Sequence, residues 1–168
     1  MKIRGKQKFN TPRKVVMLTR TTSEEGVEGT ETVQIRVRAL PMGIDQKMFE
    51  LFPEPVKPQD WAKDAKGIIL RDPETKKPMI ADVETPEYRD AARLSMHNRM
   101  GYILFHGIDD PEVQFDVTEG QEKNAAFYSG VFQQLVDFGF TMGDLSRLVA
   151  EITSLMNLSE DVETAKGN

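Results

Sequence analysis

Residues 32–40 read TVQIRVRAL, and this stretch decides the first half of the fold. Apolar side chains occupy every second position, which is the period of a strand buried on one face. The inward set is Val33, Ile35, Val37 and Ala39. Arg36 and Arg38 belong to the opposite face, where we interpret them as solubilising charges, with contact to an acidic partner as the alternative.

A second strand is predicted upstream. Residues 14–19 (KVVMLT) form a short apolar run rich in β-branched side chains, which favour strands. Residues 23–31 (SEEGVEGTE) hold glycines and acidic side chains, a composition typical of a turn. The N-terminal part is therefore expected to be a β-hairpin with a long loop.

Prolines gather in the middle of the chain. Seven of the nine lie between Pro41 and Pro86, and none follows Pro111. A residue before proline is pushed away from helical geometry, so extended connections are expected here. Residues 45–52 (DQKMFELF) predict two helical turns capped by Asp45. Residues 71–78 predict a turn between two further short strands, at 68–70 and 79–81.

The proline-free end of the chain predicts helices, because apolar residues recur there every three or four positions. The first begins at Thr85 and Pro86, a capping hydroxyl followed by a proline at the first helical position. The expected helices cover residues 85–105, 121–138 and 141–156, with a last turn at 159–165.

These elements predict an α+β fold, with one or more N-terminal β-hairpins followed by a C-terminal bundle of three to four helices. The expected divisions are a flexible basic arm at residues 1–13, a β-hairpin and proline-rich irregular region at 14–83, and a helical region at 84–168.

Composition narrows the function classes. The chain has 168 residues, a net charge of -5 and no cysteine, which excludes a disulfide scaffold and a thiol nucleophile. No apolar run is long enough to span a membrane, and no secretory signal is expected. The first twenty residues carry +7 with no acid. This basic segment makes a nucleic-acid-binding regulator one functional hypothesis, although the segment offers few aromatic side chains for base stacking.

A search for catalytic groups favours a binding protein over an enzyme. His97 and His106 are nine residues apart on one expected helix, so they should lie on opposite faces and take surface or capping roles. The acids between residues 109 and 122 lack the ligand spacing of a calcium loop, which favours a solvated acidic loop. Glycine-rich phosphate motifs are absent from the sequence. The sequence therefore predicts neither catalysis, nor a cofactor, nor a metal site.

Apolar side chains remain as candidates for protein binding. Trp61 stands in a polar stretch, either as an interface anchor or as a lid over a small core. Two helical stripes are each either a docking face or the domain's own core. The stripe residues are Met96 and Met100 on the first helix, and Leu145, Leu148, Ile152 and Leu155 on the last.

Three segments together resemble a known family. They are the strand RVRALP at residues 36–41 followed by FELFPEP at 49–55, the helix opening ETPEY at 84–88, and the stretch LSRLVAEITSLMNLSEDVETA at 145–165. In this order they resemble the tail assembly chaperones of long-tailed bacteriophages.

That resemblance implies a non-catalytic protein of the infected host cytoplasm. Such a chaperone binds the tape-measure protein and recruits tail-tube protein, and it is absent from the mature virion. Self-association is left open, whereas membrane binding is not expected and nucleic acid is not the favoured partner. The alternative is a structural virion component, such as a connector or a subunit associated with the tail tube.

Overall fold

The computed structural model describes residues 11–24, 27–118 and 120–157. Its N-terminal part is a long β-hairpin, in which β1 (Arg13–Glu24) pairs antiparallel with β2 (Val27–Arg38). The expected long loop at residues 23–31 is wrong, because the two strands continue through most of that segment. Thr19 lies opposite Thr32 in this ladder, and β-branched side chains of this kind fit a pleated surface.

The inner face of the hairpin agrees with the sequence prediction. Ile35, Val37 and Ala39 are buried, and Val33 packs against the core. Arg38, however, does more than solubilise the outer face. Its Nε donates a hydrogen bond to the backbone oxygen of His106 at 3.0 Å, and its guanidinium lies 3.7 Å from the Asp109 carboxylate. Arg38 therefore joins the strand to the loop after the next long helix.

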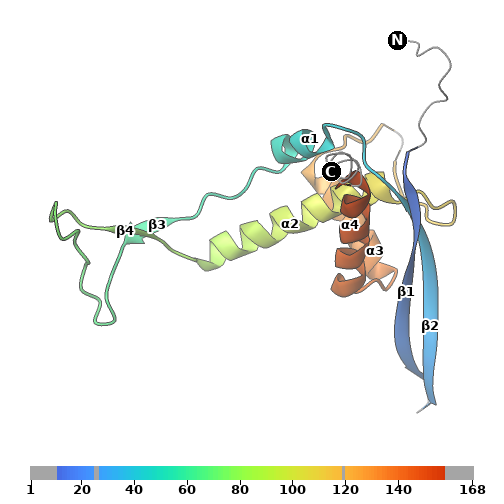
Figure 1. Cartoon of the computed structure of the whole chain (residues 1–168), viewed down its shortest axis with the longest axis horizontal. Coiled ribbons are helices and arrows are strands. Elements are labelled where there is room, and N and C mark those ends of the chain that lie inside the picture. The colour runs from blue at the N-terminus through green and yellow to red at the C-terminus, as the bar shows by residue number, and fades with distance from the viewer. Residues whose placement is uncertain (1–10, 25–26, 119, 158–168) are drawn as a thin grey trace, which may run out of the picture.

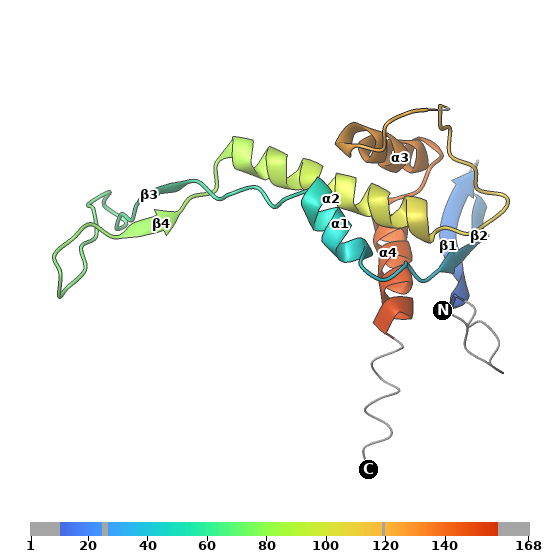
Figure 2. The ribbon, with the colours of Figure 1, turned by 90° about the horizontal axis from the view of Figure 1, so that it is seen from above.

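Three helices form the body of the protein. α2 (Pro86–Gly107) begins as predicted, with the Thr85 hydroxyl capping its first turn. α3 (Ala125–Asp137) is shorter than expected because the Asn124 side chain accepts the backbone N–H of Phe127 and fixes the helix start there. α4 (Met142–Asn157) begins after Thr141 as predicted. Figure 2 shows α3 and α4 on opposite sides of the C-terminal half of α2.

Glycines on α2 allow this close packing. A Cβ on Gly101 would collide with the backbone oxygen of Tyr128, so the backbones of α2 and α3 touch at this point. A Cβ on Gly107 would meet the side chain of Ile152 on α4. The β1–β2 hairpin packs against α4, where Lys14 forms an ion pair with Glu151 at 2.6 Å. The structure is thus the predicted α+β fold.

α1 (Ile44–Leu51) is a short helix that lies beside α2 (Figures 1 and 2). Asp45 was expected to cap it but lies inside its first turn, because Gly43 adopts the left-handed conformation at the cap position. The guanidinium of Arg99 on α2 donates to the backbone oxygen of Phe52 at 2.8 and 3.1 Å and pairs with Glu54 at 3.1 Å. These contacts anchor the end of α1 to the body.

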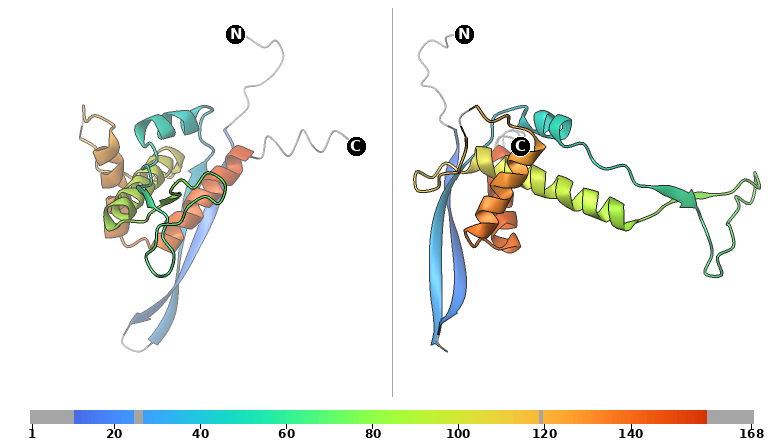
Figure 3. Two further views of the ribbon diagram at one scale, coloured as in Figure 1. Left: turned by 90° about the vertical axis from the view of Figure 1, so that its left-hand side faces the viewer. Right: turned by 180° about the vertical axis from the view of Figure 1, so that it is seen from behind.

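Between α1 and α2 the chain leaves the body, and we call residues 53–85 the extension. It carries β3 (Gln59–Trp61) and β4 (Ile80–Asp82), which pair antiparallel. Figures 1 and 3 show this small sheet well apart from the helices. The predicted turn at residues 71–78 is present, with Arg71 bridged to Pro78. The flanking strands were placed wrongly in part, since residues 68–70 form no named strand and β4 pairs with β3 instead.

None of the helices in the described part of the chain is both long and apolar enough to cross a membrane. The predicted helical turn at residues 159–165 lies outside the described residues, as do residues 1–10 of the predicted basic arm.

Candidate protein-binding surface

The apolar stripe of α4 is part of the protein's own core. Leu145, Leu148 and Ile152 have no exposed surface, and Leu155 is 7% exposed. The hairpin and α2 cover this face, so of the two readings of the stripe the core reading is confirmed. The interpretation of the α4 stripe as an exposed docking face is wrong, because its apolar side chains are buried against the hairpin and α2 of the same domain.

One of the two stripe residues of α2 belongs to the core and the other lies on the surface. Met100 is buried in the core, whereas Met96 is 46% exposed. The change comes where α2 leaves the body, since no residue of α2 before Asn98 is buried. Figure 1 shows this N-terminal half of α2 running toward the extension. Of the sequence-predicted candidates, Met96 and Trp61 are thus the two on the surface.

The histidines are packed between helices, so their predicted surface or capping roles are wrong. The His97 ring stacks on Phe132 of α3 with 4.3 Å between centroids. His106 Nε2 and the Tyr128 hydroxyl share a hydrogen bond at 3.2 Å. Burial lowers the pKa of His106, and the positive charges of Lys123, Arg38 and Lys47 lower that pKa further. Burial also raises the pKa of Tyr128 to about 12, with a smaller contribution from Tyr102.

The acids after α2 hold the fold together. Asp109 pairs with Arg13 at 2.7 Å, and the Asp110 carboxylate accepts the backbone N–H of Arg36 at 2.8 Å. These contacts fasten the loop to the base of the hairpin. Across the described ranges no three acidic or histidine side chains gather as metal ligands would.

The largest set of exposed apolar side chains belongs to the extension. Seven large apolar residues there are at least 38% exposed, although the extension adds nothing to the core. They are Val56, Trp61, Ile68, Ile69, Leu70, Met79 and Ile80. Trp61 and Ile80 stand opposite one another in the β3–β4 ladder, so they are neighbours on one face. Exposed apolar side chains that gather in one region are typical of a surface that contacts a partner.

Local hydrogen bonds shape the extension. The Asp72 carboxylate accepts the backbone N–H and the hydroxyl of Thr75 at 2.6 and 3.0 Å and the backbone N–H of Glu74 at 2.9 Å, and these bonds lower its pKa. The Asp64 carboxylate accepts the backbone N–H groups of Lys66 and Ile68, which follow it in the chain, at 2.8 and 2.9 Å. Backbone hydrogen bonds then connect the segments around Ala62, Leu70 and Met79. The N–H of Ala62 donates to the oxygen of Met79, that of Met79 to Leu70, and that of Leu70 to Ala62. The extension thus keeps a defined shape although it buries little apolar surface.

Sequence reasoning found Trp61 but missed its neighbours at residues 68–70 and 79–80, which it assigned to ordinary strands. The available signal was the prolines on both sides, Pro58 and Pro86, which separate this apolar cluster from the helical body. Comparison with family models, with curated proteins and with solved structures found no match to this chain.

Proposed function

We propose that this protein is a non-catalytic tail assembly chaperone of a long-tailed bacteriophage. It binds the tape-measure protein in the cytoplasm of the infected cell, promotes assembly of the tail tube around it, and leaves before the virion is complete. The observation that carries the proposal is the apolar surface of the extension. The order of the sequence segments at residues 36–41, 49–55 and 84–88 supports the particular family.

The extension has the chemistry that such a client needs. A tape-measure protein is long, helical and apolar, so its exposed side chains must be covered until tube subunits surround it. Burial of apolar surface favours association by about 25 cal/mol per Å². Trp61 provides a large rigid contact of the kind that dominates interfaces, and Met79 provides a flexible one that adapts to varied side chains.

Co-expression with the tape-measure protein of the same phage tests this proposal. The wild-type chain is expected to raise the soluble fraction of the tape-measure protein several-fold. The double variant Trp61→Ser/Ile80→Ser should lose most of that effect, because it removes two neighbouring apolar contacts of the extension. Met42→Ser is the matched control, since Met42 is fully exposed but lies outside the extension. Equal solubility of the tape-measure protein with and without this chain rejects the proposal.

The alternative is a structural virion component, because an exposed apolar extension also suits a subunit that joins its neighbours in a particle. Mass spectrometry of purified particles separates the two functions. A chaperone is expected to be missing from the finished particle, whereas a structural subunit is present in stoichiometric amounts.

A further inference from the structure

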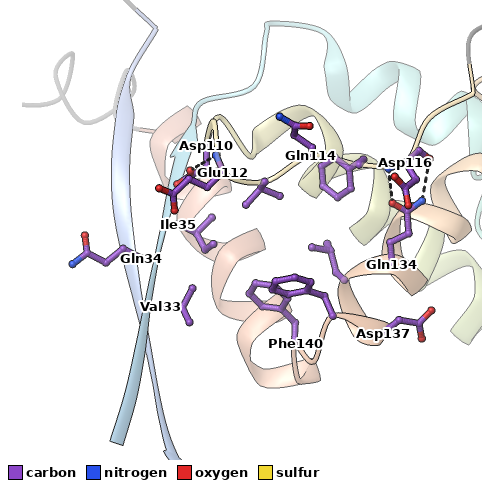
Figure 4. A pocket seen from close by; sticks show the side chains of 14 residues that line it. Val33, Gln34, Ile35, Asp110, Glu112, Gln114, Asp116, Gln134, Asp137 and Phe140 are labelled. Carbon is purple, nitrogen blue, oxygen red and sulfur yellow. Dashed lines mark hydrogen bonds between the residues drawn. The ribbon is translucent and has the colours of Figure 1, made fainter.

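A second apolar surface lies on the hairpin side of the molecule, far from the extension. It is a groove of about 540 Å³ between β2, residues 110–116 and the end of α3 (Figure 4). Its volume falls within the range of about 300–1,000 Å³ that is common for ligand sites. None of the extension residues lines it, so this surface is independent of the site proposed above.

The groove has a buried apolar floor. Ile35, Leu135 and Phe140 belong to the core and are at most 6% exposed. Phe138 stands beside them and is 82% exposed, with its ring stacked on that of Phe140 at 6.0 Å between centroids. An aromatic ring held in water against a packed floor offers a preformed contact for a large apolar side chain.

Every charged residue that lines the groove is acidic. Figure 4 shows Asp110 and Glu112 near β2 and Asp116 and Asp137 near α3, with apolar side chains between them. Asp110 is held by the backbone N–H groups of Arg36 and Glu112, and the bond from Arg36 lowers its pKa and so preserves its charge at neutral pH. Within the described residues no lysine or arginine pairs with the other three. The uncompensated negative rim favours a cationic partner.

The edge of β2 beside the groove carries backbone groups that bond to no other described residue. The N–H and C=O of Arg36 point away from β1, because they bond to the Asp110 carboxylate and to the N–H of Asp109. In an antiparallel ladder alternate residues point to the same edge, so the N–H and C=O of Gln34 also point away from β1. No described residue bonds to those backbone groups of Gln34. Such an edge can accept a further strand.

We propose that the groove binds an extended segment of a partner protein that carries large apolar side chains flanked by lysine or arginine. The bound segment pairs with the edge of β2 at Gln34. Two residues further along this edge, the backbone groups of Arg36 already bond to Asp109 and Asp110. Its apolar side chains pack on Phe138 and Phe140, and its cations approach the carboxylates of the rim. The partner is thus recognised by backbone pairing, apolar burial and charge together.

A labelled nine-residue peptide tests the proposal by fluorescence anisotropy. The probe contains isoleucine, valine and phenylalanine flanked by lysines, and its twin has glutamate in place of each lysine. The full chain should bind the lysine peptide at least tenfold more tightly than the twin. Glu112→Lys/Asp137→Lys should reverse this preference, whereas Glu50→Lys/Asp90→Lys, which changes the net charge equally on exposed positions elsewhere, should preserve it.

Hydrogen exchange adds a readout of the binding mode. On addition of the lysine peptide, exchange of the Gln34 amide is expected to slow at least fivefold, because that N–H gains a backbone acceptor. Unchanged exchange at Gln34, or equal affinity for the two peptides, overturns the proposal.

A further control concerns the chain's own basic segment, which holds Lys2, Arg4, Lys6 and Lys8 together with Ile3 and Phe9. If a chain without residues 1–10 binds the lysine peptide more than tenfold more tightly than the full chain, the natural occupant is that segment and the partner proposal is wrong. Trp61→Ser/Ile80→Ser should bind the peptide as the wild type does. That variant therefore separates a failure of the groove from a failure of the chaperone proposal.

Discussion

At the scale of single residues, position 101 accepts no side chain larger than that of glycine, because the backbone of α3 occupies the space where a Cβ would lie. Gly101→Ala should force α2 and α3 apart and lower the free energy of unfolding by at least about 1–3 kcal/mol. Gly130→Ala is the matched control: it lies inside α3 with open space around it, and alanine should stabilise that helix by up to about 1 kcal/mol. Urea unfolding of both variants measures the difference, and equal effects would contradict the close contact.

His106 gives the protein a dependence on pH. Its pKa is lowered in the folded state, so between that pKa and the ordinary value of 6.5 the unfolded chain holds more protons than the folded one. Stability therefore rises with pH through this window and falls when the buffer is acidified from pH 7.5 to 5.5. His97, whose pKa is lowered by burial and by Arg93, acts in the same direction.

Urea unfolding at the two pH values checks this dependence. In His106→Asn the loss of stability on acidification should be smaller than in the wild type, because the titrating imidazole is gone. A loss of the same size in the variant and in the wild type would assign the dependence to other groups.

At the scale of elements, the start of α4 depends on a reciprocal cap. The Asp144 N–H donates to the Thr141 hydroxyl at 3.2 Å, and the Thr141 N–H donates to the Asp144 carboxylate at 2.9 Å. Thr141→Ala removes one partner and should cost about 1 kcal/mol in thermal or urea unfolding. Thr153→Ala, on the exposed side of the same helix, should be neutral or slightly stabilising. Equal costs for both would show that the cap does not fix the helix start.

At the scale of the whole molecule, the extension is separable from the body. Every core residue lies at or before Phe52 or at or after Met100. Pro58 and Val83 are joined by a backbone hydrogen bond of 2.8 Å, so a four-residue glycine–serine linker can replace residues 59–82 without moving the chain ends.

This excision should change the free energy of unfolding by less than about 1 kcal/mol, because no core contact is lost. Ile35→Ala, by contrast, should cost about 2–5 kcal/mol through the cavity it leaves in the core. Circular dichroism during thermal unfolding compares the two. A large loss on excision would mean that the extension supports the body through contacts other than burial.

Sequence periodicity predicted the elements whose side chains bury on one face. The inward set of β2, the Thr85 cap of α2 and the Thr141 start of α4 all follow local rules, and all are confirmed. Predictions failed where pairing or packing with another segment overrode a local preference. Most of the predicted loop at residues 23–31 is strand because β1 and β2 keep pairing close to the turn, and His97 and His106 are packed because side chains of α3 lie against them.

For the candidate surfaces too, some features follow from the sequence and others only from the tertiary structure. The sequence alone determined the α+β class and the helical C-terminal half, because composition and period act over a few residues, whereas it left Trp61 open between an interface anchor and a lid over a core. Only the tertiary structure decided which apolar stripe is core: α4 is covered on its apolar face, whereas the extension projects into water. The acid-rimmed groove likewise exists only because residues 33–35, 110–116 and 134–140 meet in space. Contacts between segments so far apart depend on how the whole chain packs, and no local pattern encodes them.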